Sequence, residues 1–426
     1  MCNMGEMKNR ISCGMFDDRF VQLYGKDICL AGQRKRYCDA LSRFEELFGE
    51  AEVSVFSAPG RTEIGGNHTD HQLGKVIAGA LNIDAIAVAC RTDNAEVKVV
   101  SGDGPLITID LADLEPVASE KGTTTALVKG VLQGLFLNGF TISGFQAYVT
   151  SDVLIGSGIS SSAAFETLIG TVISGLYNDG TIPAQTIAMV GQYAENVYFG
   201  KPCGLMDQMA SAVGSLVYID FEKTDAPVVK RIDCDLSDFG YCLCITDTKS
   251  SHANCTEEYA AITAEMRKVA EFFGKEVLRQ VEKEELFANL TKVREYVGDR
   301  AVLRAIHFMN ENERVEGQAE ALRKGDFAGF LKLVKESGDS SFKFLQNIYS
   351  NCDAEHQSIS LALAVSESVL GDDGVCRVHG GGFAGTIQAY VKADKAEDYC
   401  KAMNDVFGKG ACKIYQVRQF GGVKVF

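Results

Sequence analysis

A glycine- and serine-rich segment, GSGISSSAA from Gly156 to Ala164, joins two stretches of different character. The stretch before it, GFQAYVTSDV, is strand-like, and the stretch after it, FETLIGTVISGLYNDG, is apolar enough to predict a buried helix. Glycines let the backbone approach a ligand closely, and the amides at a helix N-terminus favour an anion. The order of strand, loop and helix is therefore consistent with a phosphate site, although a flexible turn with a serine N-cap has the same composition.

The residue pattern changes along the chain from strand-like to helix-like. A helix is expected at RKRYCDALSRFEELFG and another at TTALVKGVLQGLFLNG, among strand-like runs that include AEVSVFSA, DAIAVACRT, AEVKVVSG, LITIDL, SLVYIDFE and YCLCITDT. Beyond Asp247, TEEYAAITAEMRKVAEFFG places Tyr259 and Ile262 on one apolar helical face. Further amphipathic stretches follow at Lys283–Gly298, Arg314–Gly325, Asp326–Ser337 and Ser358–Gly371, before the strand-like runs GTIQAYV and CKIYQV. We therefore predict an α+β fold with a boundary near residue 225.

Composition narrows the classes of partner. The formal net charge of −15 argues against nucleic acid or an anionic membrane as the main partner, but a few local cations and helix N-termini still hold a small phosphate compound. The 14 cysteines are scattered without zinc-type spacing, and the first twenty residues lack the apolar core of a signal peptide. We expect a cytoplasmic protein with reduced thiols. The sequence does not define an oligomeric state and is compatible with a monomer.

Three further positions carry candidate functional groups. CGLMDQ, Cys203 to Gln208, places Asp207 beside a helix of small residues, where a carboxylate serves as a general base or as an N-cap. Glu195, in QYAENVYFG, has the context of a solvated helix charge. In HGGGFAGT, three consecutive glycines precede a strand, so the chain either turns sharply or lets another group come close.

The segment GRTEIGGNHTDH, Gly60 to His71, completes a recognisable series. Arg61 with GGNHTD, then GSGISSSAA, CGLMDQ and GGGFAG, resembles the motif order of galactokinases, within the galactokinase, homoserine kinase, mevalonate kinase and phosphomevalonate kinase superfamily. The resemblance spans most of the chain and implies two α+β lobes with the active site between them. Residues 1–225 would be a ribosomal-S5-domain-2-like lobe with the sugar motif and the phosphate-binding loop. Residues 226–426 would be a ferredoxin-like lobe with GGGFAG.

The resemblance also implies an activity. The chain would transfer a phosphoryl group from ATP to the anomeric C1 hydroxyl of galactose, giving galactose 1-phosphate and ADP. Asp207 would accept or electrostatically steer the hydroxyl proton, and Arg61 would keep Asp207 ionised. The ATP phosphates would bind at Gly156, Ser157, Gly158, Ser160, Ser161 and Ser162, and Mg²⁺ at Ser162 and Glu195. The sugar would bind at Asn67, His68, Asp70, Gly204, Tyr259, Gly381 and Gly382.

One departure from the family pattern affects the substrate. Galactokinases usually read GEHTDY where this chain reads GNHTDH, so Asn67 replaces a glutamate that accepts from the C6 hydroxyl. An amide also donates, so Asn67 fits a hydroxymethyl group and would no longer repel a C6 carboxylate, which makes galacturonate the alternative substrate. The segment after Tyr259, AAITAEM, lacks the arginines of the family pattern. A non-catalytic galactose and ATP sensor is a second alternative. The presence of the whole catalytic set, Arg61, Ser162, Glu195 and Asp207, argues against it.

Overall fold

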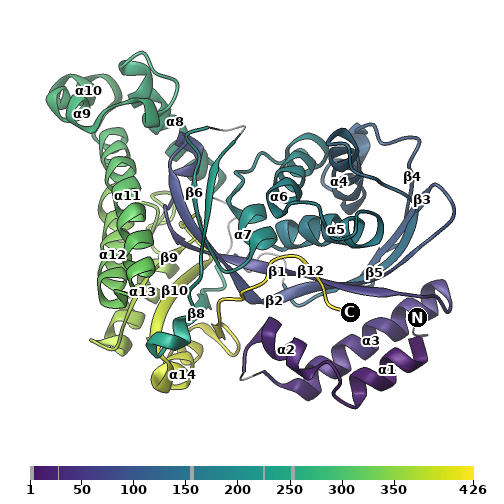
Figure 1. Ribbon diagram of the computed structural model, residues 1–426. Helices are drawn as coiled ribbons and strands as arrows, with labels where there is room; N and C mark the ends of the chain where they lie inside the picture. Colours follow the sequence, from purple (N-terminus) through teal and green to yellow (C-terminus); the bar gives the residue numbers. More distant parts are fainter. Residues whose placement is uncertain (1–3, 27, 154–157, 224–225, 251–254) are drawn as a thin grey trace. The chain divides into compact units, whose positions relative to one another are not determined.

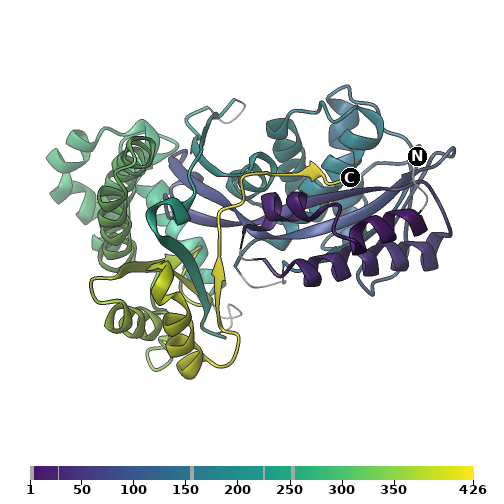
Figure 2. The same cartoon turned by 60° about the horizontal axis from the view of Figure 1, so that its bottom comes forward.

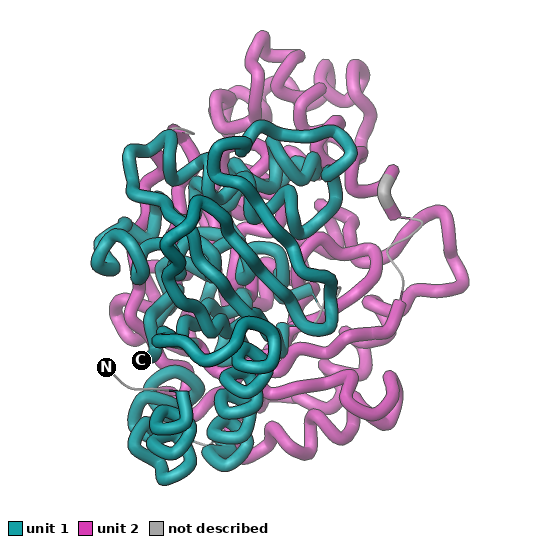
Figure 3. Tube along the Cα trace, turned by 90° about the vertical axis from the view of Figure 1, so that its right-hand side faces the viewer, with its two compact units in different colours: residues 1–61, 79–215, 418–426 teal, residues 62–78, 216–417 magenta. Residues whose placement is uncertain are grey.

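The computed structural model describes residues 4–26, 28–153, 158–223, 226–250 and 255–426. Helices and strands are mixed, with two sheets (Figure 1), which confirms the α+β prediction. The chain forms two compact units, coloured separately in Figure 3: unit 1 is Met1–Arg61, Gly79–Ser215 and Arg418–Phe426, and unit 2 is Thr62–Ala78 and Leu216–Val417. The predicted domain boundary near residue 225 stays a prediction. Two short segments, Thr62–Ala78 of unit 2 and Arg418–Phe426 of unit 1, are separated in the sequence from most of their unit, and no sequence pattern marked them.

Unit 1 is built on a twisted sheet with helices on both faces. The strand order is β12-β1-β2-β5-β3-β4 (Val423–Lys424, Ser54–Gly65, Lys75–Arg91, Phe145–Ser151, Glu96–Ser101 and Ile107–Asp110). β3 and β5 run parallel, whereas β5 pairs antiparallel with β2. The ends of β1 and β2, Thr62–Gly65 and Lys75–Ala78, belong to unit 2.

The two helical layers of unit 1 are drawn from different parts of the chain. One face of the sheet carries α1, α2 and α3 (Met4–Ser12, Asp17–Tyr24 and Leu30–Phe48), which share a core with Val55 and Ile86 (Figure 2). The other face carries α4, α5, α6 and α7 (Thr124–Leu137, Ser161–Tyr177, Ala184–Tyr193 and Met206–Val213) (Figure 1). Both layers are needed because the sheet residues are buried on both sides, with β2 almost continuously apolar.

Unit 2 combines a four-stranded antiparallel sheet with a helical layer. The sheet order is β11-β8-β10-β9 (Cys412–Tyr415, Tyr241–Asp247, Thr386–Lys392 and Gly374–His379). α13 and α14 (Ser358–Leu370 and Ala396–Phe407) share an apolar core with one face of this sheet, and α12 (Phe327–Ser340) meets Tyr390 on the other. The remaining elements are α8, α9, α10 and α11 (Thr256–Phe272, Lys283–Ala288, Leu290–Val297 and Asp299–Lys324) and the hairpin β6–β7 (Leu216–Asp220 and Val228–Ile232).

The predicted elements are found, with differences at their ends. The stretch expected from Lys283 to Gly298 is two helices, because the backbone at Asn289 leaves the helical region between α9 and α10. The stretch from Arg314 to Gly325 is the C-terminal half of the longer α11. Within the described residues, no helix is long and apolar enough to span a bilayer.

A buried carboxylate ties the sheet of unit 1 to its first helical layer and to its last segment. Asp84, in β2, is fully buried and forms ion pairs with Arg36 (2.7 Å) and with the fully buried Arg418 (3.0 Å). Ser57 and Tyr24 also donate hydrogen bonds to it. Burial raises the pKa of Asp84, but the two guanidinium groups and the two hydroxyls outweigh burial and lower it below its usual range.

Replacing Arg418 by methionine should lower the free energy of unfolding by about 3–5 kcal/mol, because it leaves a buried carboxylate with half of its charge compensation. Urea denaturation followed by circular dichroism measures the change. Lys35→Met is the matched control, since Lys35 makes an exposed pair with Asp39 that is worth about 0.5 kcal/mol or less. Equal destabilisation by the two variants would contradict the role given to Arg418.

Candidate functional site

One cavity in unit 1 gathers the residues predicted for phosphoryl transfer. It has a volume of about 570 Å³, and its wall includes Arg61, Gly158, Ser160, Ser161, Ser162, Glu195 and Asp207. Gly158 and Ser160 adopt left-handed backbone conformations, and α5 begins directly after Ser160. The amides and the positive dipole end of this 17-residue helix therefore lie at the cavity wall. Gly156 and Ser157, also predicted for the phosphates, lie outside the described residues.

Arg61 and Asp207 form a two-pronged ion pair at this wall. Nε and Nη2 of Arg61 donate to the two carboxylate oxygens of Asp207 at 2.5 and 2.6 Å, and Nη1 donates to the carbonyl of Gly158 at 2.6 Å. Burial raises the pKa of Asp207, but the charge and hydrogen bonds of Arg61, with help from Ser160, lower it below its usual range. Asp207 is thus ionised at neutral pH. It does not cap α7, because Leu205 holds the N-cap position.

Glu195 is buried rather than solvated, contrary to its reading as a helix surface charge. It lies in a π-helical turn, η3 (Ala194–Phe199), and only 3% of it is exposed. Its carboxylate accepts hydrogen bonds from Ser162 (3.1 Å) and Gln208 (2.9 Å) and lies 3.4 Å from the ammonium of Lys201. Single π-helical turns are frequent at functional sites.

A second acid lies behind Glu195. The amide of Gln208 donates to Glu195 and also to Glu166 of α5, at 3.0 Å, so it bridges two carboxyl groups. Glu166 is fully buried, and burial, followed by the negative charge of Glu195, raises its pKa well above the usual value. We infer that Glu166 is neutral where Glu195 is charged, since two buried carboxylates this close repel each other.

Unit 2 gathers another set of predicted residues around its glycine-rich turn. Tyr259 of α8 donates its hydroxyl to the carbonyl of Gly382 (2.7 Å), and a Cβ at Gly381 would overlap the Tyr259 ring. His68 Nε2 lies 2.8 Å from the carbonyl of Gly381 and therefore carries a proton. Burial lowers the pKa of His68 to about 4, so its ring is neutral. Gly381 thus leaves room for the ring of Tyr259, whereas a Cβ at Gly382 would overlap Asn347.

The two remaining residues predicted to bind the sugar, Asp70 and Gly204, lie beside short turns. Asp70 begins a short 3₁₀ turn, η1 (Asp70–Gln72), where one carboxylate oxygen accepts from the amide of His71 at 2.9 Å. Its side chain is 17% exposed. Gly204 lies in unit 1, directly before the first turn of α7.

Asn67 is buried in a network of protein groups. Only 1% of it is exposed, and its amide donates to the carbonyl of Gly380 (2.7 Å) and to Glu63 (3.0 Å). Its side-chain oxygen accepts from Asn347 at 2.7 Å. Glu63 in turn forms a buried ion pair with Arg377 at 2.6 Å. Both amide hydrogens and the side-chain oxygen of Asn67 thus have protein partners, and its predicted contact with the sugar C6 group stays a prediction.

Sequence reasoning missed four residues that organise these sites: Glu63, Glu166, Gln208 and Arg377. Glu166 had a usable signal, since it is a lone charge in an otherwise apolar helix. Gln208 stood beside Asp207 in a segment already singled out. Glu63 and Arg377 had none, because they are 314 positions apart and each resembles an ordinary strand charge.

Comparisons with known proteins show the family of the chain. The galactokinase galactose-binding signature matches residues 42–91, and the GHMP kinases N terminal domain matches residues 126–215. A Streptomyces coelicolor galactokinase is 33% identical over 379 residues, covering 88% of this chain and 94% of that protein. The human galactokinase is 33% identical over 398 residues, covering 91% and 96%. The chain belongs to the galactokinase family.

Solved structures extend the likeness to the fold. The Lactococcus lactis galactokinase complexed with galactose has a TM-score of 0.74 and 26% identity, covering 90% of this chain and 97% of that one. A mevalonate kinase from Methanococcus jannaschii, 15% identical with a TM-score of 0.59, covers 87% and 99% and shares the fold. These neighbours confirm the predicted fold class of this galactokinase-family chain.

Replacing Glu166 by glutamine should stabilise the protein at neutral pH, by about 1 kcal/mol or more, with a gain that disappears in acid. The folded protein holds a proton on Glu166 that the unfolded chain releases above about pH 4.5, so wild-type stability falls as the pH rises through that value. The glutamine variant lacks this loss. Urea denaturation at pH 4 and at pH 7.5 measures the difference.

The exposed Glu50 provides the control, because Glu50→Gln should leave the dependence of stability on pH unchanged. If Glu166→Gln behaves like this control, Glu166 is ionised in the folded protein and the inference of a neutral acid is wrong.

Proposed function

We propose that this chain is an ATP-dependent sugar kinase that phosphorylates galactose at its anomeric C1 hydroxyl, giving galactose 1-phosphate and ADP. The observation that carries the proposal is the Arg61–Asp207 ion pair in the wall of a cavity that also holds the N-terminus of α5 and Glu195. Family membership supports the reaction, and the galactose complexed by the Lactococcus lactis neighbour supports the substrate.

Each group at the cavity has a part in phosphoryl transfer, which depends mainly on positioning and electrostatics. The backbone amides at the start of α5, with the hydroxyls of Ser160 and Ser161, would hold ATP phosphate oxygens. Asp207 is ionised, so it is able to accept the C1 hydroxyl proton or orient that hydroxyl. Arg61 would offset the negative charge that gathers on the transferring group.

The residues at the cavity also fit a magnesium ion. Mg²⁺ prefers oxygen ligands, and the Ser162 hydroxyl and the Glu195 carboxylate are 3.1 Å apart at the wall. When bound there, Mg²⁺ would neutralise phosphate charge. Gln208 would hold the Glu195 carboxylate in place, and the neutral Glu166 would accept the second amide hydrogen of Gln208 without adding charge.

For the sugar, we propose that His68, Asp70, Gly204 and Tyr259 contribute contacts and that the backbone at Gly381 and Gly382 lies close to it. The neutral His68 ring keeps one nitrogen as an acceptor, because its Nε2 proton is donated to Gly381. The amide of His71 donates to one carboxylate oxygen of Asp70, and the other oxygen would accept hydrogen bonds from sugar hydroxyls.

Neither alternative function is favoured. A sensor without catalysis does not require the charged Arg61–Asp207 pair or the buried Glu195, both of which are in place. Galacturonate gains no support from Asn67, because Glu63 and Gly380 take the amide hydrogens that would have bound a carboxylate.

Galactose should be the best substrate in a coupled assay of ADP release that also includes galacturonate, N-acetylgalactosamine and arabinose. Asp207→Asn should lower kcat for galactose by about 10²- to 10⁴-fold, because it removes the ionised proton acceptor while keeping the shape of the side chain. Galactose binding, measured by calorimetry, should change much less. Absence of galactose turnover by the wild type would refute the proposal.

Glu195→Gln should raise the Mg²⁺ concentration needed for half-maximal activity by about 10- to 100-fold, because an amide is a weaker ligand than a carboxylate. Titration of activity with Mg²⁺ at saturating galactose measures this shift. Glu50→Gln should leave the Mg²⁺ dependence unchanged. A loss of kcat with an unaltered Mg²⁺ requirement would remove Glu195 from the metal site.

A further inference from the structure

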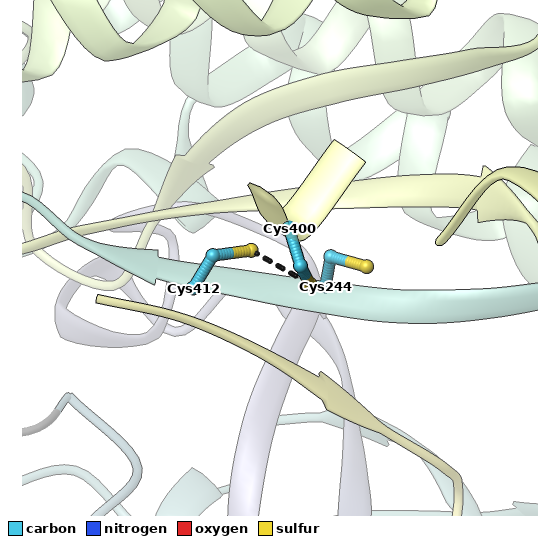
Figure 4. A group of neighbouring side chains, drawn as sticks. All are labelled: Cys244, Cys400 and Cys412. Atoms are coloured by element: carbon cyan, nitrogen blue, oxygen red, sulfur yellow. Dashed lines mark hydrogen bonds between the residues drawn. The ribbon is translucent and has the colours of Figure 1, made fainter. Parts of the chain in front are cut away.

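Three cysteine side chains from different elements of unit 2 meet at one point. Cys244 comes from β8, Cys400 from α14 and Cys412 from β11, and Figure 4 shows the three side chains together. The sulfurs of Cys400 and Cys412 are 3.2 Å apart, and all three sulfurs lie within 4.8 Å of one another. All three residues carry free thiols.

The sheet register explains why two of these thiols meet. β8 and β11 are antiparallel, with Cys412 opposite Thr246, and Thr246 lies two residues after Cys244. Side chains two residues apart on a strand share a face, and those of directly opposed residues do too. Cys244 and Cys412 are therefore diagonal neighbours on the face covered by α14, which supplies Cys400.

We propose that these thiols form a binding site for a thiophilic divalent d¹⁰ metal cation of the zinc class. Thiolate sulfurs about 2.3 Å from one zinc ion lie about 3.8 Å apart in a tetrahedral arrangement. The sulfur separations in unit 2, from 3.2 Å to within 4.8 Å, bracket that value. The proposal is independent of the kinase activity.

The surroundings suit such a cation. Cys244 and Cys412 are buried in an apolar core, which excludes competing hard ligands, while Cys400 is only partly buried and gives the cation a way in. The hydroxyl of Thr246 is fully buried beside Cys412 and has no oxygen or nitrogen partner among the described residues. The Thr246 hydroxyl is able to donate a hydrogen bond to the metal-bound sulfur of Cys412, as outer-shell groups of metal sites do.

Binding would replace S–H bonds by metal–sulfur bonds. Each of the three thiols releases its proton to solvent, and the thiolates keep the electron pairs that bind the cation, so no oxidant or reductant is required. A bound cation would join β8, β11 and α14 through side chains. We expect the cation to have a structural role. Because it would bind the folded chain and not the unfolded one, it would raise the thermal stability of unit 2 by mass action.

The test uses the full chain, stripped of metal with a chelator under reducing conditions. Zn²⁺ is titrated against a chromophoric competing chelator, and Cd²⁺ is added separately because cadmium thiolates absorb in the near ultraviolet. We expect one ion per chain and a thiolate absorption band. Cys400→Ala and the double variant Cys400→Ala with Cys412→Ala should weaken binding by about tenfold or more.

Cys376→Ala is the matched control, since Cys376 lies in the same apolar core but outside the group of three sulfurs. It should bind the cation like the wild type. Kinase activity and the melting temperature without metal check that each variant folds. Wild-type protein that shows no cadmium–thiolate band overturns the proposal, and so does a folded double variant that keeps wild-type affinity for Zn²⁺.

Discussion

The charge of Arg61 holds the candidate site of unit 1 together. One guanidinium group binds both oxygens of Asp207 and the carbonyl of Gly158, so it connects the first turn of α7 to the loop before α5. Without that cation, burial would favour a protonated Asp207, which would not attract a proton from a sugar hydroxyl. The position and the protonation state of the acid therefore have the same cause.

Near Glu195, an amide and a protonated acid, rather than a guanidinium group, surround the carboxylate. Two acids lie on either side of the Gln208 amide, and the deeper one, Glu166, avoids repulsion by keeping its proton. The shallower acid remains available at the cavity wall, beside Ser162. The Gln208 amide, which lies between the neutral Glu166 and the carboxylate of Glu195, thus orients that carboxylate without a second buried negative charge.

Local sequence was informative where local physics decides the structure. The loop before α5 and the apolar face of α8 follow from glycine freedom and helical periodicity, and both were predicted. The burial of Glu195 was not predictable, because a π-helical turn and the packing of Gln208 come from tertiary structure. The same holds for Asn67, whose neighbour Glu63 needs Arg377 from 314 positions away.

The pairing of β12 with β1 has a consequence for the order in which the chain folds on the ribosome. Lys424 lies opposite Phe56, and Arg418 reaches back 334 positions to Asp84. Most of unit 1 is synthesised early, yet its edge strand and one cation of its buried cluster are added last. Until then, Arg36 is the only cationic partner of Asp84 among the residues that the structure describes, so the nascent unit 1 should stay loosely packed throughout the synthesis of unit 2.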